Sequence, residues 1–332
     1  MKRWTNSDSA SHGDFMRIAL LLTPFSNHHL ELAAQIGVEE IVSVYPGLEL
    51  EDLHQIRRQV QSFGMKLGVV ERYLPMLEII HGTAERDQQV SDIKALIRNL
   101  GEAEVPVLCY SWMPDDDWQR TSLEFEDRGG ARVTECDIRD PESFESVTGF
   151  RSYAESSTSS DQLWDNLESF LNEVIPVAED AGVRLAMHPD DPPVSELRGQ
   201  PRIMSTVASF ERLVKMVDSP ANGICLCQGS FASSAEQYDI PGLIRHLAPH
   251  IVFAHFRDVI GEVPHFRETF HDSGKTDMAS CMRAYLELGL DCPIRPDHVP
   301  TLAGETNEFP GYHMMGRLWA VGYMRGLMQA IA

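Results

Sequence analysis

Four side chains of metal-binding type occur at the ends of short apolar runs in the second half of the chain. They are His188 in "VRLAMH", Cys227 in "GICLCQ", His255 in "IVFAHF" and Asp297 in "CPIRPD". Two imidazoles, a thiolate and a carboxylate suit a borderline divalent metal such as Mn, Zn, Co or Fe(II), whereas Ca or Mg alone would require an all-oxygen site. The residues therefore predict a metal site, provided that the four runs end on the same face of the fold.

Two arginines accompany these candidate ligands at the spacing of a β-strand. Arg257 follows His255 by two residues, and Arg295 precedes Asp297 by two. Alternate residues of a strand lie on the same face, so each arginine is expected beside a ligand. A metal with two guanidinium groups is suited to a carboxylate substrate, and both arginines are predicted to bind it.

Each residue also has a simpler explanation when it is taken alone. A histidine at a strand end is commonly a hydrogen-bonded core residue, a buried cysteine is commonly packing, and "RPDH" could be a salt-bridged turn. Cys225, on the face of Cys227, is interpreted as packing, and "DDDW" at 115–118 as part of a solvated lid and not a second metal site. Ligand types at the ends of four successive runs favour the metal site over these separate explanations.

The elements that would position these residues are short strands alternating with amphipathic helices. Helical patterns include "DLHQIRRQVQSFG", "QVSDIKALIRNLGEA", "LWDNLESFLNEVIPVAEDAG" and a final "GRLWAVGYMRGLMQAIA". The runs are too apolar for a sheet with one solvated face, so parallel strands covered by helices are expected. Eight strands predict a closed TM (β/α)8 barrel, in which the carboxyl ends of the strands form the active face. An open doubly wound sheet is the alternative, but no strand is followed by GxGxxG. The predicted strands are 17–22, 39–45, 66–71, 105–110, 183–188, 223–228, 251–256 and 292–297.

Two segments stand apart from this alternation. Residues 1–15 are polar, lack the apolar stretch of a signal peptide, and are interpreted as a disordered leader or extension. Residues 16–332 are expected to form one catalytic barrel domain. Within it, residues 111–160 separate the fourth strand from its helix, and such a long insertion is predicted to be a lid over the mouth of the barrel.

Composition narrows the classes of partner. The net charge is −22, from 28 basic and 50 acidic side chains, which disfavours nucleic acid and anionic lipid surfaces. An acidic substrate would need local positive charge from a metal or arginine. No apolar run approaches 18 residues, so no membrane partner is expected. Six cysteines without an export signal suggest a reduced, cytoplasmic protein.

The blocks "HPDDPP", "CQGSF", "HFRDV", "FHDSGKTDM" and "RPDHVPT" resemble the mannonate dehydratase family, whose members have a xylose-isomerase-like barrel. The resemblance extends from residue 16 to the C-terminus. It implies metal ligation by the four residues named above and functional roles for Arg295, His298 and Tyr312. Larger family members have a tyrosine after "GY" where this chain has Met315, so the functional tyrosine is assigned to Tyr312. The chain is also shorter than those members, so its lid is expected to differ.

The resemblance implies a metal-dependent dehydratase that converts D-mannonate to 2-keto-3-deoxy-D-gluconate, with Mn2+ as the expected cofactor and Fe2+, Co2+ or Zn2+ as alternatives. His298 and Tyr312 are the predicted acid and base, and Tyr312 would need a lowered pKa to act as the base. A sugar isomerase or epimerase, a dehydratase of another hexonate, and a non-catalytic sugar-acid sensor are the alternatives. The expected partner is a small sugar acid. The protein itself is expected to be a homo-oligomer, namely a dimer.

Overall fold

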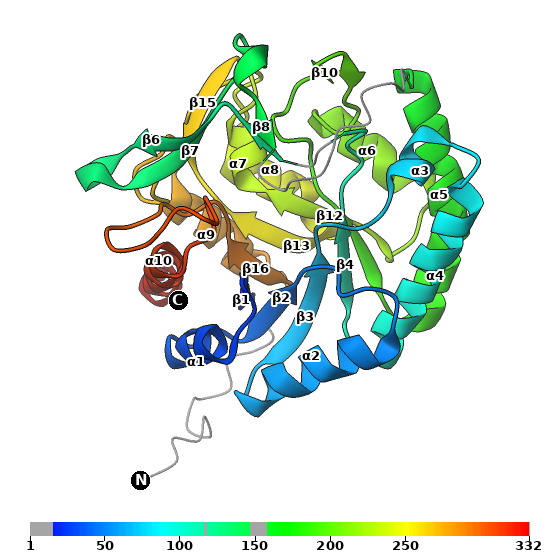
Figure 1. The fold of residues 1–332 in the computed structure, drawn as a ribbon, viewed down its shortest axis with the longest axis horizontal. Coiled ribbons are helices and arrows are strands. Elements are labelled where there is room, and N and C mark those ends of the chain that lie inside the picture. Colours follow the sequence, from blue (N-terminus) through cyan, green and yellow to red (C-terminus); the bar gives the residue numbers. More distant parts are fainter. Residues whose placement is uncertain (1–15, 116–117, 147–157, 332) are drawn as a thin grey trace.

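Eight parallel strands close into a barrel at the centre of the protein (Figure 1). The computed structural model describes residues 16–115, 118–146 and 158–331. The predicted leader, residues 1–15, lies outside the described residues. The barrel strands are β1 (Arg17–Leu21), β2 (Glu40–Ser43), β3 (Lys66–Glu71), β4 (Val107–Tyr110), β9 (Arg184–Met187), β12 (Asn222–Cys227), β13 (Ile251–Phe256) and β16 (Pro293–Pro296).

The strands follow one another around the barrel in chain order, and β1 closes it by pairing with both β2 and β16. Each of the eight predicted strands is present, so the predicted TM barrel is confirmed and the open doubly wound sheet is wrong. The register sets the site: Cys227 is opposite His255 in the β12–β13 pair, and His255 is opposite Arg295 in the β13–β16 pair. The carboxyl ends of β12, β13 and β16 therefore lie at the same height, on one face of the barrel.

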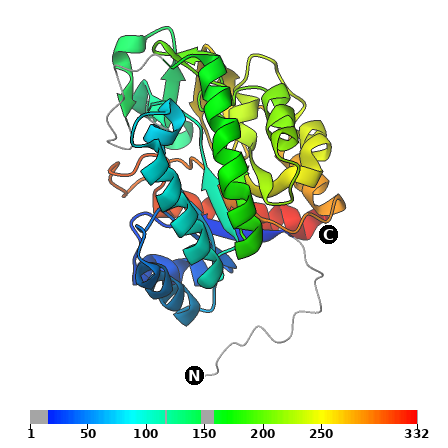
Figure 2. The same cartoon turned by 90° about the vertical axis from the view of Figure 1, so that its right-hand side faces the viewer.

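Helices cover the outside of the barrel. In Figure 2, α4 and α5 run side by side along the molecule. The Ser159 side chain accepts a hydrogen bond from the Gln162 amide to begin α5, and Gly182, at φ 68°, ends it. The helices are α1 (Asn27–Gln35), α2 (Leu50–Ser62), α3 (Leu77–His81), α4 (Arg86–Glu102), α5 (Ser160–Ala181), α6 (Val207–Met216), α7 (Gln228–Ala232), α8 (Ile240–Leu247), α9 (Met278–Glu287) and α10 (Met314–Ile331), with 3-10 turns at Arg128–Gly130, Pro141–Ser143 and Ala248–His250.

The apolar core has two layers because successive strand residues face opposite ways. In β1, Ile18 and Leu20 belong to the layer between strands and helices, whereas Ala19 and Leu21 belong to a smaller cluster inside the barrel. Cys225 lies in this inner cluster, below the mouth. Among the described residues, no helix is both long and apolar enough to cross a membrane.

The long insertion between β4 and α5 contains strands of its own. They are β5 (Gln119–Arg120), β6 (Ser122–Glu126), β7 (Arg132–Asp137) and β8 (Glu145–Ser146). A hairpin that follows β13, formed by β14 (Val259–Glu262) and β15 (His265–Glu268), pairs with β7 to give a four-stranded sheet in the order β14-β15-β7-β6. A further small hairpin joins β10 (Glu196–Leu197) to β11 (Gln200–Pro201). The described part of the insertion is thus anchored to the loop after β13.

Candidate metal centre and active site

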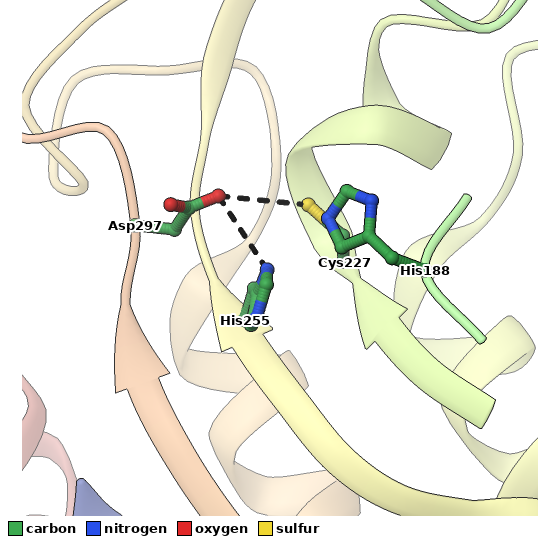
Figure 3. A group of neighbouring side chains, drawn as sticks. All are labelled: His188, Cys227, His255 and Asp297. Atoms are coloured by element: carbon green, nitrogen blue, oxygen red, sulfur yellow. Dashed lines mark hydrogen bonds and ion pairs between the residues drawn. The ribbon is translucent and has the colours of Figure 1, made fainter. Parts of the chain in front are cut away.

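The four predicted metal ligands converge at the mouth of the barrel (Figure 3). Their nearest ligand atoms all lie within 4.8 Å of one another. Asp297 Oδ2 is 3.9 Å from the Cys227 sulfur and 3.6 Å from His255 Nδ1. Three of the side chains are buried and His188 is half-buried. The structure therefore brings together residues that are up to 109 positions apart in the chain, from 188 to 297.

The electrostatics of the cluster favour the deprotonated ligands that a metal requires. Burial alone would raise the pKa of Cys227, but hydrogen bonds to His188 and His255 and the charge of Arg257 hold that pKa well below its ordinary value. Burial likewise opposes ionisation of Asp297, and the adjacent Arg295 keeps its pKa well below the usual range. A thiolate, a carboxylate and two imidazoles in one buried cluster fit a divalent metal of intermediate softness.

Hydrogen bonds orient both histidines for metal binding. His188 Nδ1 donates to the Pro189 carbonyl at 2.7 Å, which leaves Nε2 as its ligand atom. His255 Nε2 is 3.2 Å from the carboxylate of Glu71, which leaves Nδ1 on the side of Asp297. Glu71 is the last residue of β3 and was missed by the sequence analysis. Its position at the end of a predicted strand, like the positions of the four predicted ligands, was the feature of the sequence that could have indicated a role in the site.

The two predicted substrate-binding arginines have different environments. Arg295 lines the cavity, but its guanidinium is held at 2.6 Å by Glu71 and at 2.7 Å by Asp297. Arg257 is fully buried, bonded at 2.6 Å to both Asp191 and Glu268, and is not among the residues that line the cavity. The structure thus does not place Arg257 on the cavity wall, and its contact with substrate stays a prediction. The physical reason for this position is its pairing with two buried carboxylates.

His298 and Tyr312 both contact the metal-site carboxylate. The Tyr312 hydroxyl donates to Asp297 Oδ1 at 2.9 Å, and His298 Nε2 is 3.4 Å from Oδ2. Burial raises the pKa of Tyr312 above its ordinary value, against the effect of the nearby Arg72, so the expected lowering is not found. Burial also holds the pKa of His298 well below its usual range.

Close packing fixes the position of His298. This residue has a left-handed backbone, at φ 47°, and a Cβ added to Gly311 would lie 3.2 Å from its Nδ1 and 3.3 Å from the Trp118 ring. The ring of Trp118, in the insertion, is centred 4.4 Å from that of His298 and 5.6 Å from that of Tyr312. Glycine at 311 therefore allows the tryptophan and the histidine to meet.

The prediction of a solvated lid at 115–118 is wrong for its two described residues. Asp115 is buried and accepts hydrogen bonds from Arg202 at 2.5 Å and Gln119 at 3.0 Å, and Trp118 is buried against the site. Residues 116 and 117 lie outside the described residues. Acidic residues in a loop suggested solvation, but sequence could not show the buried arginine that pairs with Asp115.

A cavity of about 290 Å³ opens beside these groups. Its wall includes the candidate ligands His188, His255 and Asp297, and it continues between Tyr110, Met113 and the segment from Arg72 to Glu78 that follows β3. Such a volume accommodates a small molecule. Within the described residues, Cys109, Cys225 and His255 form a second buried group with metal-ligand atoms in reach of one another. Burial raises the pKa of Cys225 well above its ordinary value, which agrees with its interpretation as packing.

Comparison with known proteins assigns the family. The sequence model of the D-mannonate dehydratase (UxuA) family matches residues 26–149 and 140–332. The chain belongs to the D-mannonate dehydratase family. Enzymes of this family depend on a divalent metal, in agreement with the donor set at the barrel mouth.

Individual family members cover nearly the whole chain. A mannonate dehydratase of Thermotoga neapolitana is 37% identical, over 91% of this chain and 94% of its own. One from Shouchella clausii is 36% identical, over 91% and 93%. The crystal structure of mannonate dehydratase from Streptococcus suis serotype 2 superimposes with a TM-score of 0.85 at 30% identity, covering 96% of this chain and 94% of that one.

More distant structures share the barrel alone. D-psicose 3-epimerase from Clostridium cellulolyticum H10 superimposes with a TM-score of 0.61 at 14% identity, over 95% of this chain and 99% of its own. This likeness supports the xylose-isomerase-like barrel and carries no argument about the reaction.

Proposed function

We propose that this protein dehydrates D-mannonate to 2-keto-3-deoxy-D-gluconate with a divalent metal held by His188, Cys227, His255 and Asp297. One observation supports this most: His298 and Tyr312 both contact Asp297, so two groups able to transfer protons adjoin the candidate metal ligands on one cavity wall. Family membership supplies the substrate.

The reaction removes the proton from C2 of the sugar acid and expels the C3 hydroxyl as water. The C2 proton is weakly acidic because it adjoins a carboxylate. A bound metal would stabilise the negative charge that develops on this carboxylate. The cationic Arg295, fixed by Glu71 and Asp297, adds positive charge beside the same site.

His298 and Tyr312 carry the proton transfers in this proposal. One takes the C2 proton and the other delivers a proton to the departing C3 hydroxyl, and the resulting enol then tautomerises to the 2-keto acid. Trp118 packs against both rings and limits their movement and their contact with water. The acid and base are thus fixed by the insertion as well as by the barrel.

We propose Mn2+ as the metal. The donor set contains one sulfur, two nitrogens and one carboxylate, and the substrate adds oxygen ligands. A site of such mixed character accepts Mn2+, Fe2+, Co2+ or Zn2+, and the oxygen-rich substrate favours the first. To rank the four ions, metal-free protein is reloaded separately with each of them, and the dehydratase activities are compared at equal metal occupancy.

The deciding experiment is incubation of the Mn2+-loaded protein with D-mannonate and a 2-keto-acid assay. We expect stoichiometric keto acid, and no product after chelation. Activity on neutral aldoses or ketoses without keto acid from mannonate would indicate an isomerase or epimerase instead. Tight binding of mannonate without turnover in the metal-loaded protein would indicate a sensor. A parallel series of other hexonates establishes the stereochemistry that the cavity accepts.

A further inference from the structure

Asp191, in the loop after β9, has one carboxylate oxygen that is engaged by the protein and one that is not. The residue is 2% exposed, and it lines the cavity together with His188 and His298. Its Oδ2 accepts hydrogen bonds from Arg120 at 3.0 Å and from Arg257 at 2.6 Å. Its Oδ1 is buried and has no hydrogen-bond partner among the described residues. A buried polar atom without a partner is costly, and a ligand that supplies the missing bond removes that cost.

The setting of Asp191 keeps its carboxylate ionised. Arg120 and Arg257 each bond to both Asp191 and Glu268, so two positive and two negative charges balance in one buried cluster. Burial would raise the pKa of Asp191, but the charges of the two arginines hold that pKa well below its ordinary value. An ionised carboxylate can only accept hydrogen bonds. The partner of Oδ1 must therefore be a donor, which a hydroxyl is and the carboxylate of a sugar acid is not.

Glu268 provides a contrast within the same cluster. Its Oε1 accepts hydrogen bonds from Arg120 and Arg257, and its Oε2 accepts one from Arg257 Nε at 2.9 Å. Neither Glu268 nor the two arginines line the cavity, whereas Asp191 does. The Oδ2 atom of Asp191 is bonded to these arginines, which leaves Oδ1 as the oxygen available to the cavity.

Asp191 lies close to the candidate metal site without belonging to it. Arg257 Nη1 is 2.6 Å from Asp191 Oδ2 and 3.6 Å from the sulfur of Cys227, so a single guanidinium nitrogen separates the two side chains. In the proposed reaction the carboxylate, C2 and the C3 hydroxyl of the substrate are engaged at the metal and at His298 and Tyr312. The donors left for Asp191 are the hydroxyls at C4, C5 and C6.

We propose that Asp191 accepts a hydrogen bond from one hydroxyl of the sugar acid beyond C3 and so helps to select the substrate. This inference rests on the proposed function, because it assumes a sugar acid that reacts at C2 and C3. The fixed negative charge also disfavours the reversed substrate, whose carboxylate would face Asp191. Asp191 would thus determine which end of the carbon chain lies at the metal.

The test compares Asp191→Asn with the matched control Glu268→Gln. Both substitutions remove one negative charge from the same two arginines, but only Asp191 lines the cavity. The substrates are D-mannonate and three analogues that lack the hydroxyl at C4, C5 or C6. We expect Asp191→Asn to lower kcat/KM for D-mannonate about 10- to 100-fold, the effect of losing a hydrogen bond to a charged group. For one of the analogues, the same substitution should lower kcat/KM by about threefold or less, because the hydroxyl is already missing.

The control and a second variant separate substrate binding from a structural effect. Glu268→Gln should change kcat/KM by the same factor for all four acids. Asp191→Glu keeps the charge beside the arginines but displaces the oxygens by one methylene, so it should show the substrate dependence of Asp191→Asn. Melting temperature and metal content show whether each variant is folded, and Asp191→Glu carries the comparison if Asp191→Asn does not fold. A uniform factor for all four acids in the Asp191 variants overturns the proposal, as does an equal substrate dependence in Glu268→Gln.

The two proposals fail in distinguishable ways. If the wild type converts D-mannonate but the Asp191 variants affect all four acids alike, the dehydratase stands and the role of Asp191 is wrong. If the Mn2+-loaded wild type binds D-mannonate without converting it, the dehydratase is wrong. Calorimetric dissociation constants for the four acids then replace kcat/KM and decide on Asp191 by the same comparison. If the wild type neither binds nor converts D-mannonate, both proposals are overturned.

Discussion

Glu71, at the end of β3, and Arg295, in β16, form a two-pronged ion pair beneath the candidate metal site. Both side chains are buried, and the shorter of the two bonds is 2.6 Å. The same carboxylate lies 3.2 Å from His255 Nε2, so it fixes the orientation of a metal ligand and of the cavity arginine together. One buried carboxylate thus links the third barrel strand to the seventh and eighth strands, which carry the site.

This ion pair predicts acid sensitivity. Burial would raise the pKa of Glu71, but Arg295 and His255 lower it from 4.5 to about 2. Because the pKa is lower in the folded state, the stabilisation is present above about pH 4.5 and is lost as the pH falls towards 2. The shift corresponds to about 3 kcal/mol. Chemical denaturation of chelator-treated protein, carried out at a series of pH values across this range, measures the loss in the free energy of unfolding.

The variant Glu71→Gln should be destabilised at pH 6 and should approach the wild type near pH 2, because it has no carboxylate to protonate. Glu49→Gln, at an exposed position before α2, is the control and should run parallel to the wild type. A constant difference between Glu71→Gln and the wild type at every pH would contradict the predicted linkage.

Two neighbouring cysteines on one strand allow a matched test of the metal site. Cys227→Ser should weaken metal binding by at least about tenfold and abolish turnover, since the thiolate is a direct ligand in the proposal. Cys225→Ser is equally buried but should keep metal and activity, with a stability cost of about 1–3 kcal/mol for the buried hydroxyl. Atomic emission and a keto-acid assay distinguish the two. Full metal content in Cys227→Ser would remove that residue from the site.

Isotope exchange assigns the two proton-transfer groups. We expect His298→Asn and Tyr312→Phe each to lower kcat by about 10²- to 10⁴-fold. In D2O, the variant that lacks the base should show no deuterium at C2 of recovered mannonate. The variant that lacks the acid should still exchange this proton while water loss is slow. Near-wild-type kcat in either variant would exclude that residue from proton transfer.

The sequence was sufficient for the barrel and for the convergence of the four candidate ligands. Both depend on local patterns: apolar runs mark the strands, and ligand types at their ends must meet once a parallel barrel closes. His298 and Tyr312 came from the family resemblance, and the structure places both against Asp297.

The partners of the buried charges could not be predicted in this way. Strand alternation directed Arg257 inward, but its carboxylates come from the loop after β9 and from β15. Trp118 reaches the site from an insertion whose pairing with β15 no periodicity reveals. Glu71 ends an ordinary apolar strand and Arg72 follows it, and only the closed barrel shows that both line the cavity.

Gly229, in the short helix α7 that follows Cys227, allows the buried Arg257 to pass close to the backbone. A Cβ at this position would lie 2.4 Å from Arg257 Cγ and Cδ. The guanidinium is held at 2.6 Å by Asp191 and Glu268, so the side chain has little freedom to move away. We expect Gly229→Ala to cost about 1–3 kcal/mol and to weaken metal binding, because Arg257 Nη1 also lies 3.6 Å from the Cys227 sulfur.

Gly322→Ala is the matched control for this prediction. Gly322 is exposed in α10, and nothing lies within 4 Å of its added Cβ. Alanine favours the helix over glycine, so this variant should be more stable by about 0.5–1 kcal/mol and bind metal normally. Thermal unfolding and metal titration of both variants decide the matter. If Gly229→Ala kept wild-type stability and metal affinity, Arg257 would be free to shift, and its buried ion pairs would not be what holds the Cys227 side of the site in place.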